Sequence, residues 1–301
     1  MSGSTLKKLG LVCGFLIALW LTYLYRQIPH GKTPFAKVAD SAVQIVRQQG
    51  PKTVQLSKET GSWQVQLAAG GTAPAEDSEV RQLLSALKEV QLEDEISDRA
   101  DRASEFQVDE VSGTRITLKD VKGGLLGDGI FGKQAPDAMH LYLRFPDQPN
   151  VYLARGLFPE ELGKADPNDW RRKELVNLPE TRVQSIHIES NGVETNFVRV
   201  STDAWTMNGK PADMAALNAV IGNLSHLKAD GFIDLAAYPG LTYESLKLAR
   251  VVVRSPETSV ELHIGIMDAR TKRYPVSIGK DAGLAWLSQP TVDSILKIKR
   301  S

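Results

Sequence analysis

The chain has 301 residues, with 36 basic and 36 acidic side chains, so its formal net charge at pH 7 is zero. This balance argues against a dedicated nucleic-acid-binding protein, which needs an excess of Lys and Arg to neutralise phosphates. A hydrophobic content of 42% argues against disorder, and a single cysteine excludes an intramolecular disulfide and a multi-cysteine metal site.

Residues 9–25 form an apolar segment of 17 residues without a charge, which is the short end of what spans a bilayer as a helix. Lys7 and Lys8 precede the segment, and aromatic residues gather at its C-terminal end, where such rings favour the lipid–water interface. No small-residue cleavage site follows. We therefore predict an uncleaved transmembrane anchor at 9–25, a cytoplasmic tail at 1–8 and an extracytoplasmic body. The alternative is a cleaved signal peptide.

The polar composition after the anchor predicts a stalk over 26–50, with a short helix within 37–47. The rest of the chain divides into two halves that resemble each other. We predict a first module at 51–157, a connector at 158–180 and a second module at 181–301.

The repeat is indicated by landmarks that recur in the same order. Trp63 and Trp205 are each followed by a proline and by apolar residues at the three-and-four spacing of a helix face. The remaining pairs are Ile96 with Ile233, Arg115–Leu118 with Arg250–Val253, Tyr152 with Trp286, and Pro159 with Pro290. A shared order of landmarks favours duplication. Matching aromatic positions indicate core packing, because a duplicated fold repeats its core first.

The predicted fold class is α+β, with an N-terminal transmembrane helix followed by two tandem, internally similar modules. Residues 140–145 and 261–266 alternate apolar and polar side chains, as half-buried strands do. The predicted helices are few and do not alternate regularly with strands. We therefore expect mostly antiparallel sheets in each module.

A glycine-rich string at 127–134 matches G-x-G-x-x-G and nearly matches a phosphate-binding loop. Gln134 replaces the Ser or Thr that such a loop uses to bind Mg²⁺, and Ala135 and Pro136 follow where a helix should begin. We predict a glycine-rich hairpin here and no nucleotide site.

No catalytic residue, metal ligand or cofactor is predicted from the spacing of the polar residues. His140, His187 and His263 each alternate with aliphatic residues in strands, which predicts solvated side chains. The carboxylates of 93–95 and 98–102 are interpreted as solvated surface. A carboxylate pair for glycoside hydrolysis is defined by separation in space, so the sequence leaves that possibility open.

The predicted connector contains one candidate for contact with a partner. Trp170 has no counterpart in the repeat and is followed by Arg171, Arg172 and Lys173. A tryptophan beside cations is typical of a binding patch, so Trp170, Arg171 and Arg172 are candidate contact residues. The alternative interpretation is that Trp170 covers the junction between the modules while its neighbours are solvated.

The string at 170–176 (WRRKELV), the strand at 183–188, the Trp–Pro–helix units and the Tyr238–Leu241 turn resemble the bacterial domain-of-unknown-function family 4340. The resemblance covers most of the predicted body, and the sequence departs from the family pattern at Phe106–Asp109, where an aromatic-Gly-Leu turn is expected. The resemblance to this family implies a single-span envelope protein. Some members are encoded beside transport permeases and components of gliding-motility-type ABC transporters, which implies an accessory role. No functional residues come with this family.

We therefore expect a membrane-anchored accessory or scaffold protein of the bacterial envelope, attached to the cytoplasmic membrane by residues 9–25. The expected partner is an envelope protein, with a component of an ABC-type transporter as the implied class, and no nucleic acid. An enzyme is the less favoured alternative, namely an envelope hydrolase with a carboxylate pair that spacing does not reveal. A small-ligand binder in the groove between the modules is a further alternative.

Overall fold

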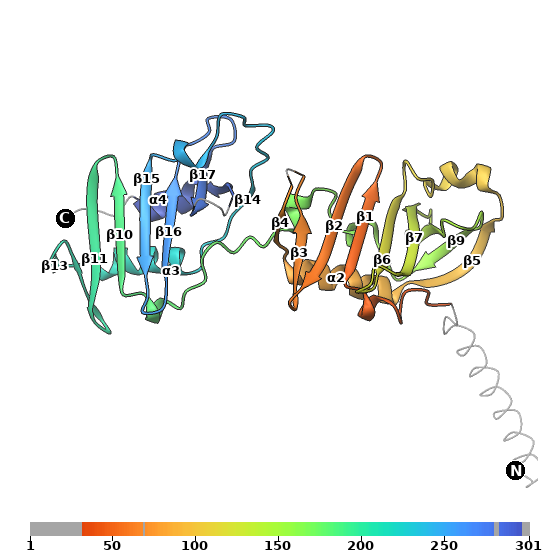
Figure 1. The fold of residues 1–301 in the computed structure, drawn as a ribbon, viewed down its shortest axis with the longest axis horizontal. Helices are drawn as coiled ribbons and strands as arrows, with labels where there is room; N and C mark the ends of the chain where they lie inside the picture. The colour runs from red at the N-terminus through yellow and green to blue at the C-terminus, as the bar shows by residue number, and fades with distance from the viewer. Residues whose placement is uncertain (1–31, 69, 280–282, 297–301) are drawn as a thin grey trace, which may run out of the picture. The chain divides into compact units, whose positions relative to one another are not determined.

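The computed structural model describes residues 32–68, 70–279 and 283–296 (Figure 1). The chain divides into two compact units, with the boundary between residues 170 and 171. This boundary lies inside the predicted connector. Each unit has its own hydrophobic core.

The predicted tail and anchor at 1–25 lie outside the described residues. Among the helices that the structure does describe, none combines the length and the apolar character needed to cross a membrane.

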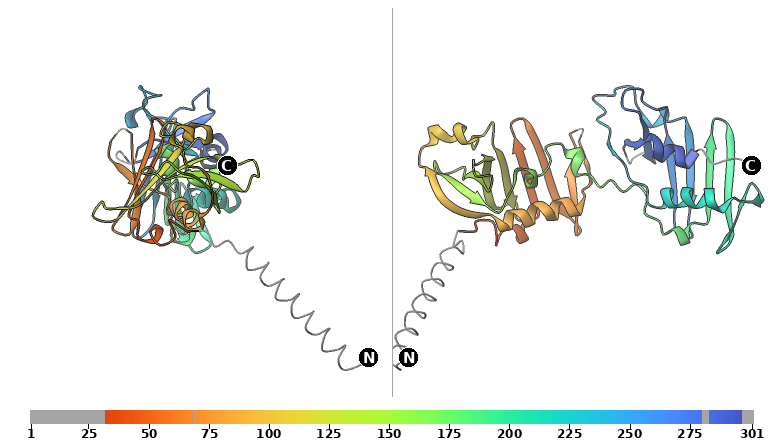
Figure 2. Two further views of the ribbon diagram at one scale, coloured as in Figure 1. Left: turned by 90° about the vertical axis from the view of Figure 1, so that its right-hand side faces the viewer. Right: turned by 180° about the vertical axis from the view of Figure 1, so that it is seen from behind.

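The first unit is a nine-stranded antiparallel sheet with one long helix, α2, across its core face (Figure 2). The strand order is β4-β3-β2-β1-β6-β7-β8-β9-β5. In chain order the elements are η1 (Ala39–Ser41), β1 (Gln44–Gln49), β2 (Lys52–Glu59), β3 (Ser62–Gln66), β4 (Thr72–Pro74), α2 (Asp77–Glu89), β5 (Gln91–Ser97), η2 (Ala100–Phe106), β6 (Thr114–Lys119), β7 (Leu125–Gln134), β8 (His140–Arg144), β9 (Val151–Arg155), η3 (Pro159–Leu162) and η4 (Pro167–Trp170).

The second unit has the same plan, with strand order β13-β12-β11-β10-β15-β16-β17-β18-β14. Its elements are η5 (Glu180–Arg182), β10 (Ser185–Ser190), β11 (Val193–Ser201), β12 (Ala204–Met207), β13 (Lys210–Pro211), α3 (Met214–Ser225), β14 (Gly231–Phe232), η6 (Tyr243–Ser245), β15 (Ala249–Arg254), β16 (Ser259–Ile264), β17 (Arg273–Ile278), β18 (Ala285–Ser288) and α4 (Gln289–Leu296). The prediction of an α+β fold with mostly antiparallel sheets is confirmed.

The matching tryptophans lie in β3 and β12, the second strand from one edge of each sheet, and both are buried in the main core of their unit. Pro74 and Pro211 occupy the edge strands β4 and β13, three residues ahead of the helices. A proline is tolerated there because an edge strand has one side without ladder hydrogen bonds.

The residues predicted as stalk and connector include a segment that opens each copy of the repeat, which we call the opening segment; in the first unit it covers residues 32–43. In the first unit the N–H of Leu92 donates to the carbonyl of Lys32 at 2.8 Å, and in the second the N–H of Ala229 donates to that of Lys173 at 2.7 Å. The short helices η1 and η5 then lead into β1 and β10. The helix predicted within 37–47 is instead η1 followed by β1. Few side chains of these segments are buried, so they show little hydrophobic periodicity.

One of the predicted landmark pairs is shifted by a residue. Gln48 and Glu189 are each the fifth residue of their strand, β1 and β10. Arg115 lies opposite Gln48 and Arg250 lies opposite Glu189, so the pairing of Arg115 with Arg250 is confirmed. Tyr152, however, lies on the main-core side of β9, where its ring faces Phe145. Trp286 lies on the other side of β18, in a separate cluster.

The prediction of a glycine-rich hairpin at 127–134 is wrong, because these residues lie within the single strand β7, where glycines make room for Phe35 of the opening segment. A Cβ added at Gly129 would lie 2.9 Å from the Phe35 ring, and one at Gly127 would lie 3.2 Å from it. Strand register matches Gly129 with Leu262 of the second unit, and Phe35 matches Val176. The large residue on the opening segment and the small one on the strand therefore exchange places between the units.

A duplicated ion pair lies on the opposite face of each sheet, where β6 meets β7 and β15 meets β16. Arg115 donates to Asp128 at 3.0 and 2.7 Å, and Arg250 donates to Glu261 at 2.7 and 3.1 Å. Hydrogen bonding by Arg250, with a smaller contribution from His263, lowers the pKa of Glu261 to about 2.

The exchange at Phe35 and Gly129 predicts strong coupling between these residues. Phe35→Val leaves a cavity and should cost about 2 kcal/mol, and Gly129→Leu overpacks the core and should cost at least about 2 kcal/mol. The double variant copies the pair of residues found in the second unit. Its free energy of unfolding should exceed the value expected from the sum of the two single changes by more than about 1 kcal/mol. Native-state hydrogen exchange of β1, β6 and β7 measures this.

Gly240→Ala is the control, because an added Cβ there meets nothing within 4 Å. It should change stability by less than about 0.5 kcal/mol. Strict additivity of the two core substitutions would contradict the proposed exchange.

The Arg250–Glu261 pair predicts a specific loss of stability in acid. Because the folded-state pKa of Glu261 is depressed to about 2, the pair stabilises the fold above the ordinary glutamate pKa, and this contribution is lost as the pH falls from about 4.5 towards 2. The side chain of Glu261 is 39% exposed, so solvent screening reduces the effect to about 1 kcal/mol between pH 7 and pH 3. Urea unfolding at both pH values should show a smaller acid loss for Glu261→Gln than for the unaltered chain. Glu194→Gln, an exposed glutamate on β11, should leave the acid loss unchanged.

Candidate functional site

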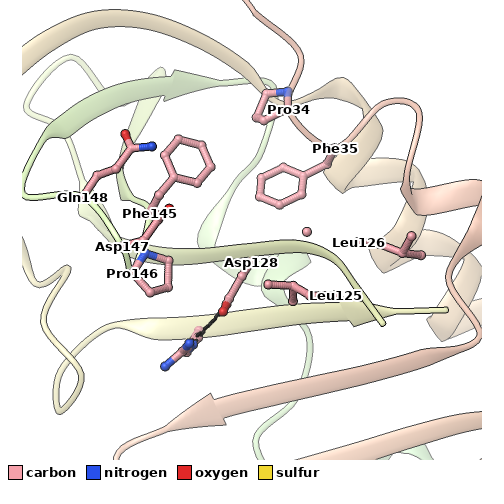
Figure 3. Close-up of a pocket in the computed structure, with 11 residues that line it drawn as sticks. Pro34, Phe35, Leu125, Leu126, Asp128, Phe145, Pro146, Asp147 and Gln148 are labelled. Carbon is pink, nitrogen blue, oxygen red and sulfur yellow. Dashed lines mark hydrogen bonds and ion pairs between the residues drawn. The ribbon is translucent and has the colours of Figure 1, made fainter. Parts of the chain in front are cut away.

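A pocket of about 510 Å³ lies at one end of the first sheet (Figure 3). Three segments and one side chain line it: the opening segment at 34–35, the start of β7 at 125–128, the β8–β9 turn at 145–148, and Arg115 of β6. These segments are far apart in the sequence. They meet because β1 and β7 begin, and β6 and β8 end, at the same end of the sheet.

Aromatic rings form one wall of the pocket. Phe35 is buried, and its ring centroid lies 5.8 Å from that of Phe131 and 6.5 Å from that of Phe145. The Phe145 ring in turn lies 6.2 Å from the Tyr152 ring, edge to face. This packing fixes the rings, so the wall is formed before any ligand binds.

The β8–β9 turn is held in place by Arg144. Its Nη1 donates to the carbonyl oxygens of Phe145, Pro146 and Gln148 at 3.4 to 3.5 Å. Its Nε donates to the carbonyl of Val108 at 2.8 Å, which ties the turn to the β5–β6 loop. The pocket rim is therefore supported from behind by a charged side chain.

The polar part of the pocket is the Arg115–Asp128 pair. Besides the two bonds from Arg115, Asp128 accepts a hydrogen bond from the Thr117 hydroxyl at 3.1 Å. Asp128 therefore accepts three hydrogen bonds from two neighbouring side chains, an arrangement that suits a structural ion pair. The other carboxylate on the rim is Asp147, which is exposed. Over the described residues no group of His, Cys, Asp and Glu is arranged to hold a metal ion.

The predicted contact residues of the connector are placed differently from one another. Trp170 is 2% exposed, belongs to the core of the first unit and donates from Nε1 to the carbonyl of Lys164 at 2.8 Å. Arg171 is buried with its guanidinium 3.4 Å from the ring centroid of Phe232, and burial lowers its pKa to about 10. The side chain of Arg172 is exposed. Contact of these residues with a partner stays a prediction, and of the three only Arg172 presents its side chain at the surface.

Two histidines predicted to be solvated are engaged by carboxylates. His140 lies between Asp137, 2.6 Å from Nδ1, and Glu93, 2.9 Å from Nε2. The backbone N–H of Met139, followed by His140, lowers the pKa of Asp137. His263 contacts Glu261 at 2.6 Å. For His140, alternation carries no information about the neighbouring strand and turn that supply Glu93 and Asp137, whereas Glu261 lies two residues before His263 on the same strand.

Sequence reasoning missed the pocket altogether. Its walls come from residues 34–35 of the predicted stalk, from the start of β7 at 125–128 and from the β8–β9 turn at 145–148. The only local signal was the pair of glycines at 127 and 129 in a strand, which indicates close approach by another group.

Comparison with known proteins gave one match, to a protein-family model. The family model described as Domain of unknown function (DUF4340) matches residues 63–242, which is more than half of the chain. Neither the curated proteins nor the solved structures gave a match. The chain therefore belongs to the DUF4340 family, as the resemblance of its motifs indicated.

Proposed function

We propose that this chain is a membrane-anchored, extracytoplasmic accessory protein of the bacterial envelope that acts by binding a protein partner. In this proposal the pocket of the first unit receives a segment of a membrane protein. A component of an ABC-type transporter is the partner class that the family resemblance implies.

The observation that carries this proposal is the position of the pocket beside the opening segment. Pro34 lines the pocket and lies nine positions after Tyr25, the end of the predicted anchor. A chain of that length reaches at most about 30 Å. The pocket is therefore tethered near the membrane surface, where the exposed segments of an integral membrane partner lie.

The chemistry of the pocket suits a short peptide segment. Its volume falls within the range of small ligand sites, and its walls are mainly apolar and aromatic. The Phe35 and Phe145 rings offer contact area for an apolar side chain, while Arg115 and Gln148 provide donors for carbonyl groups. A few polar groups on an apolar wall orient a ligand without reacting with it.

The hydrolase alternative has weaker support. Asp128 and Asp147 both line the pocket, but Asp128 is already bonded to Arg115 and Thr117. A glycosidase needs one protonated and one free carboxylate. Cleavage of envelope glycan by the purified chain, lost in Asp147→Asn, would support this alternative instead.

Photo-cross-linking in cells tests the proposal. A photoreactive amino acid at Gln148, on the exposed rim, should give an adduct with an integral membrane protein in the full chain. The same amino acid at Met139, which is 51% exposed at the other end of the sheet, should not. Leu125→Asp should lower the adduct yield about fivefold or more, because it places a charge on an apolar wall.

Val111→Asp is the matched control, since Val111 is also a largely exposed aliphatic residue of the first unit but does not line the pocket. It should leave the yield unchanged. Equal yields from positions 148 and 139, or no protein adduct at either, would overturn the proposed function.

A further inference from the structure

The tip of the β6–β7 hairpin, residues 120–124, together with Leu125, exposes aliphatic side chains next to lysines. Val121 is 80% exposed and Leu125 is 64% exposed. Lys122 is exposed between them, and Lys119 precedes the tip. A tip with this composition combines apolar area with positive charge.

The tip has a fixed shape. One carboxylate oxygen of Asp120 accepts from the backbone N–H groups of Lys122 and Gly124, at 2.8 Å each. The N–H of Asp120 also donates to the carbonyl of Gly124 at 2.9 Å. Asp120 is thus turned inward onto the backbone, and the outward side chains are those of Val121, Lys122 and Leu125.

The second unit contains the same hairpin without these features. The β15–β16 turn at 255–258 reads Ser-Pro-Glu-Thr, and Glu257 forms an ion pair with Arg182. Because the two hairpins occupy equivalent places in a repeated sheet, the fold does not require an aliphatic, lysine-bearing tip. Only the first unit, which follows the predicted anchor, has an aliphatic, lysine-bearing tip on this hairpin.

The tip also lies at the end of the sheet where the chain enters the first unit. The N–H of Val43, at the end of the opening segment, donates to the carbonyl of Lys119 at 3.0 Å. Leu125 and Pro34 line the same pocket. The short chain between Tyr25 and Pro34 therefore limits how far the tip can be from the bilayer, to the order of 30 Å.

We propose that this hairpin tip rests in the headgroup region of the membrane that holds the anchor. Val121 inserts its aliphatic side chain at the headgroup–acyl boundary, and Lys119 and Lys122 bind anionic lipid headgroups. This second contact fixes the orientation of the first unit on the bilayer. It rests on the anchor of the proposed function, but it needs no protein partner.

Fluorescence of a polarity-sensitive probe on single cysteines tests this. The full chain, with Cys13→Ser, carries Val121→Cys or the control Thr258→Cys on the equivalent turn of the second unit, and is reconstituted in phosphatidylethanolamine–phosphatidylglycerol vesicles. Lipids with a nitroxide near the headgroup should quench the probe at 121 about twofold more than the probe at 258, because the tip lies within about 10 Å of that depth. Lys122→Glu should reduce quenching at 121.

Retention of the chain in alkaline carbonate reports on the anchor separately. Release from the membrane would contradict the anchor and with it the proposed function. Retention with equal quenching at both positions would overturn the tip contact alone. Shielding of position 121 in native membranes but not in the purified vesicles would assign the tip to a protein partner, and would also overturn the lipid contact.

Discussion

The packing of Phe35 against the backbone of Gly127 and Gly129 is the contact on which the functional features of the first unit depend. It fixes the opening segment onto the start of β7, because only glycines leave space for the ring there. The same ring forms a wall of the pocket. The contact also brings the entering chain beside the β6–β7 hairpin. Removing it would release the opening segment from the start of β7 and take away one wall of the pocket.

Comparison of the two units separates the contacts that both copies of the fold share from those that one copy alone has. Both units retain the buried tryptophan, the amphipathic helix and the Arg–carboxylate pair between matching strands. The second unit fills the place of Gly129 with Leu262 and carries a polar turn in place of the aliphatic tip. Core contacts are thus shared, while the contacts at the entry end differ. This pattern is compatible with the proposed function, in which the first unit alone binds a partner beside the membrane.

The sequence predicted the parts of the fold that have strong local patterns. The helices at Asp77–Glu89 and Met214–Ser225 and the alternating strands follow from the spacing of apolar residues. The opening segment at 32–43 escaped prediction because it is held mainly by one buried ring and by backbone hydrogen bonds. The pocket escaped for a related reason, since one of its walls comes from Phe35, which lies 90 residues before Leu125 in the sequence. The pairing of Trp286 with Tyr152 was off by one residue because a strand with apolar residues on both faces has no alternation that fixes the register.

The short tether gives the scaffold interpretation its physical basis. A flexible stalk over 26–50 would let the body rotate freely, so a binding site would sample many orientations and lose affinity to ordering entropy. The structure replaces most of that stalk with a packed segment, a short helix and a strand, which leaves few residues between the predicted anchor and the core. Under the proposed function, a pocket joined to the anchor by few residues would meet a membrane partner at high effective concentration. An accessory protein that binds a partner benefits from a short linker that holds its binding site in place. A hydrolase that acts on an extended glycan benefits instead from a long linker that lets its active site reach the substrate.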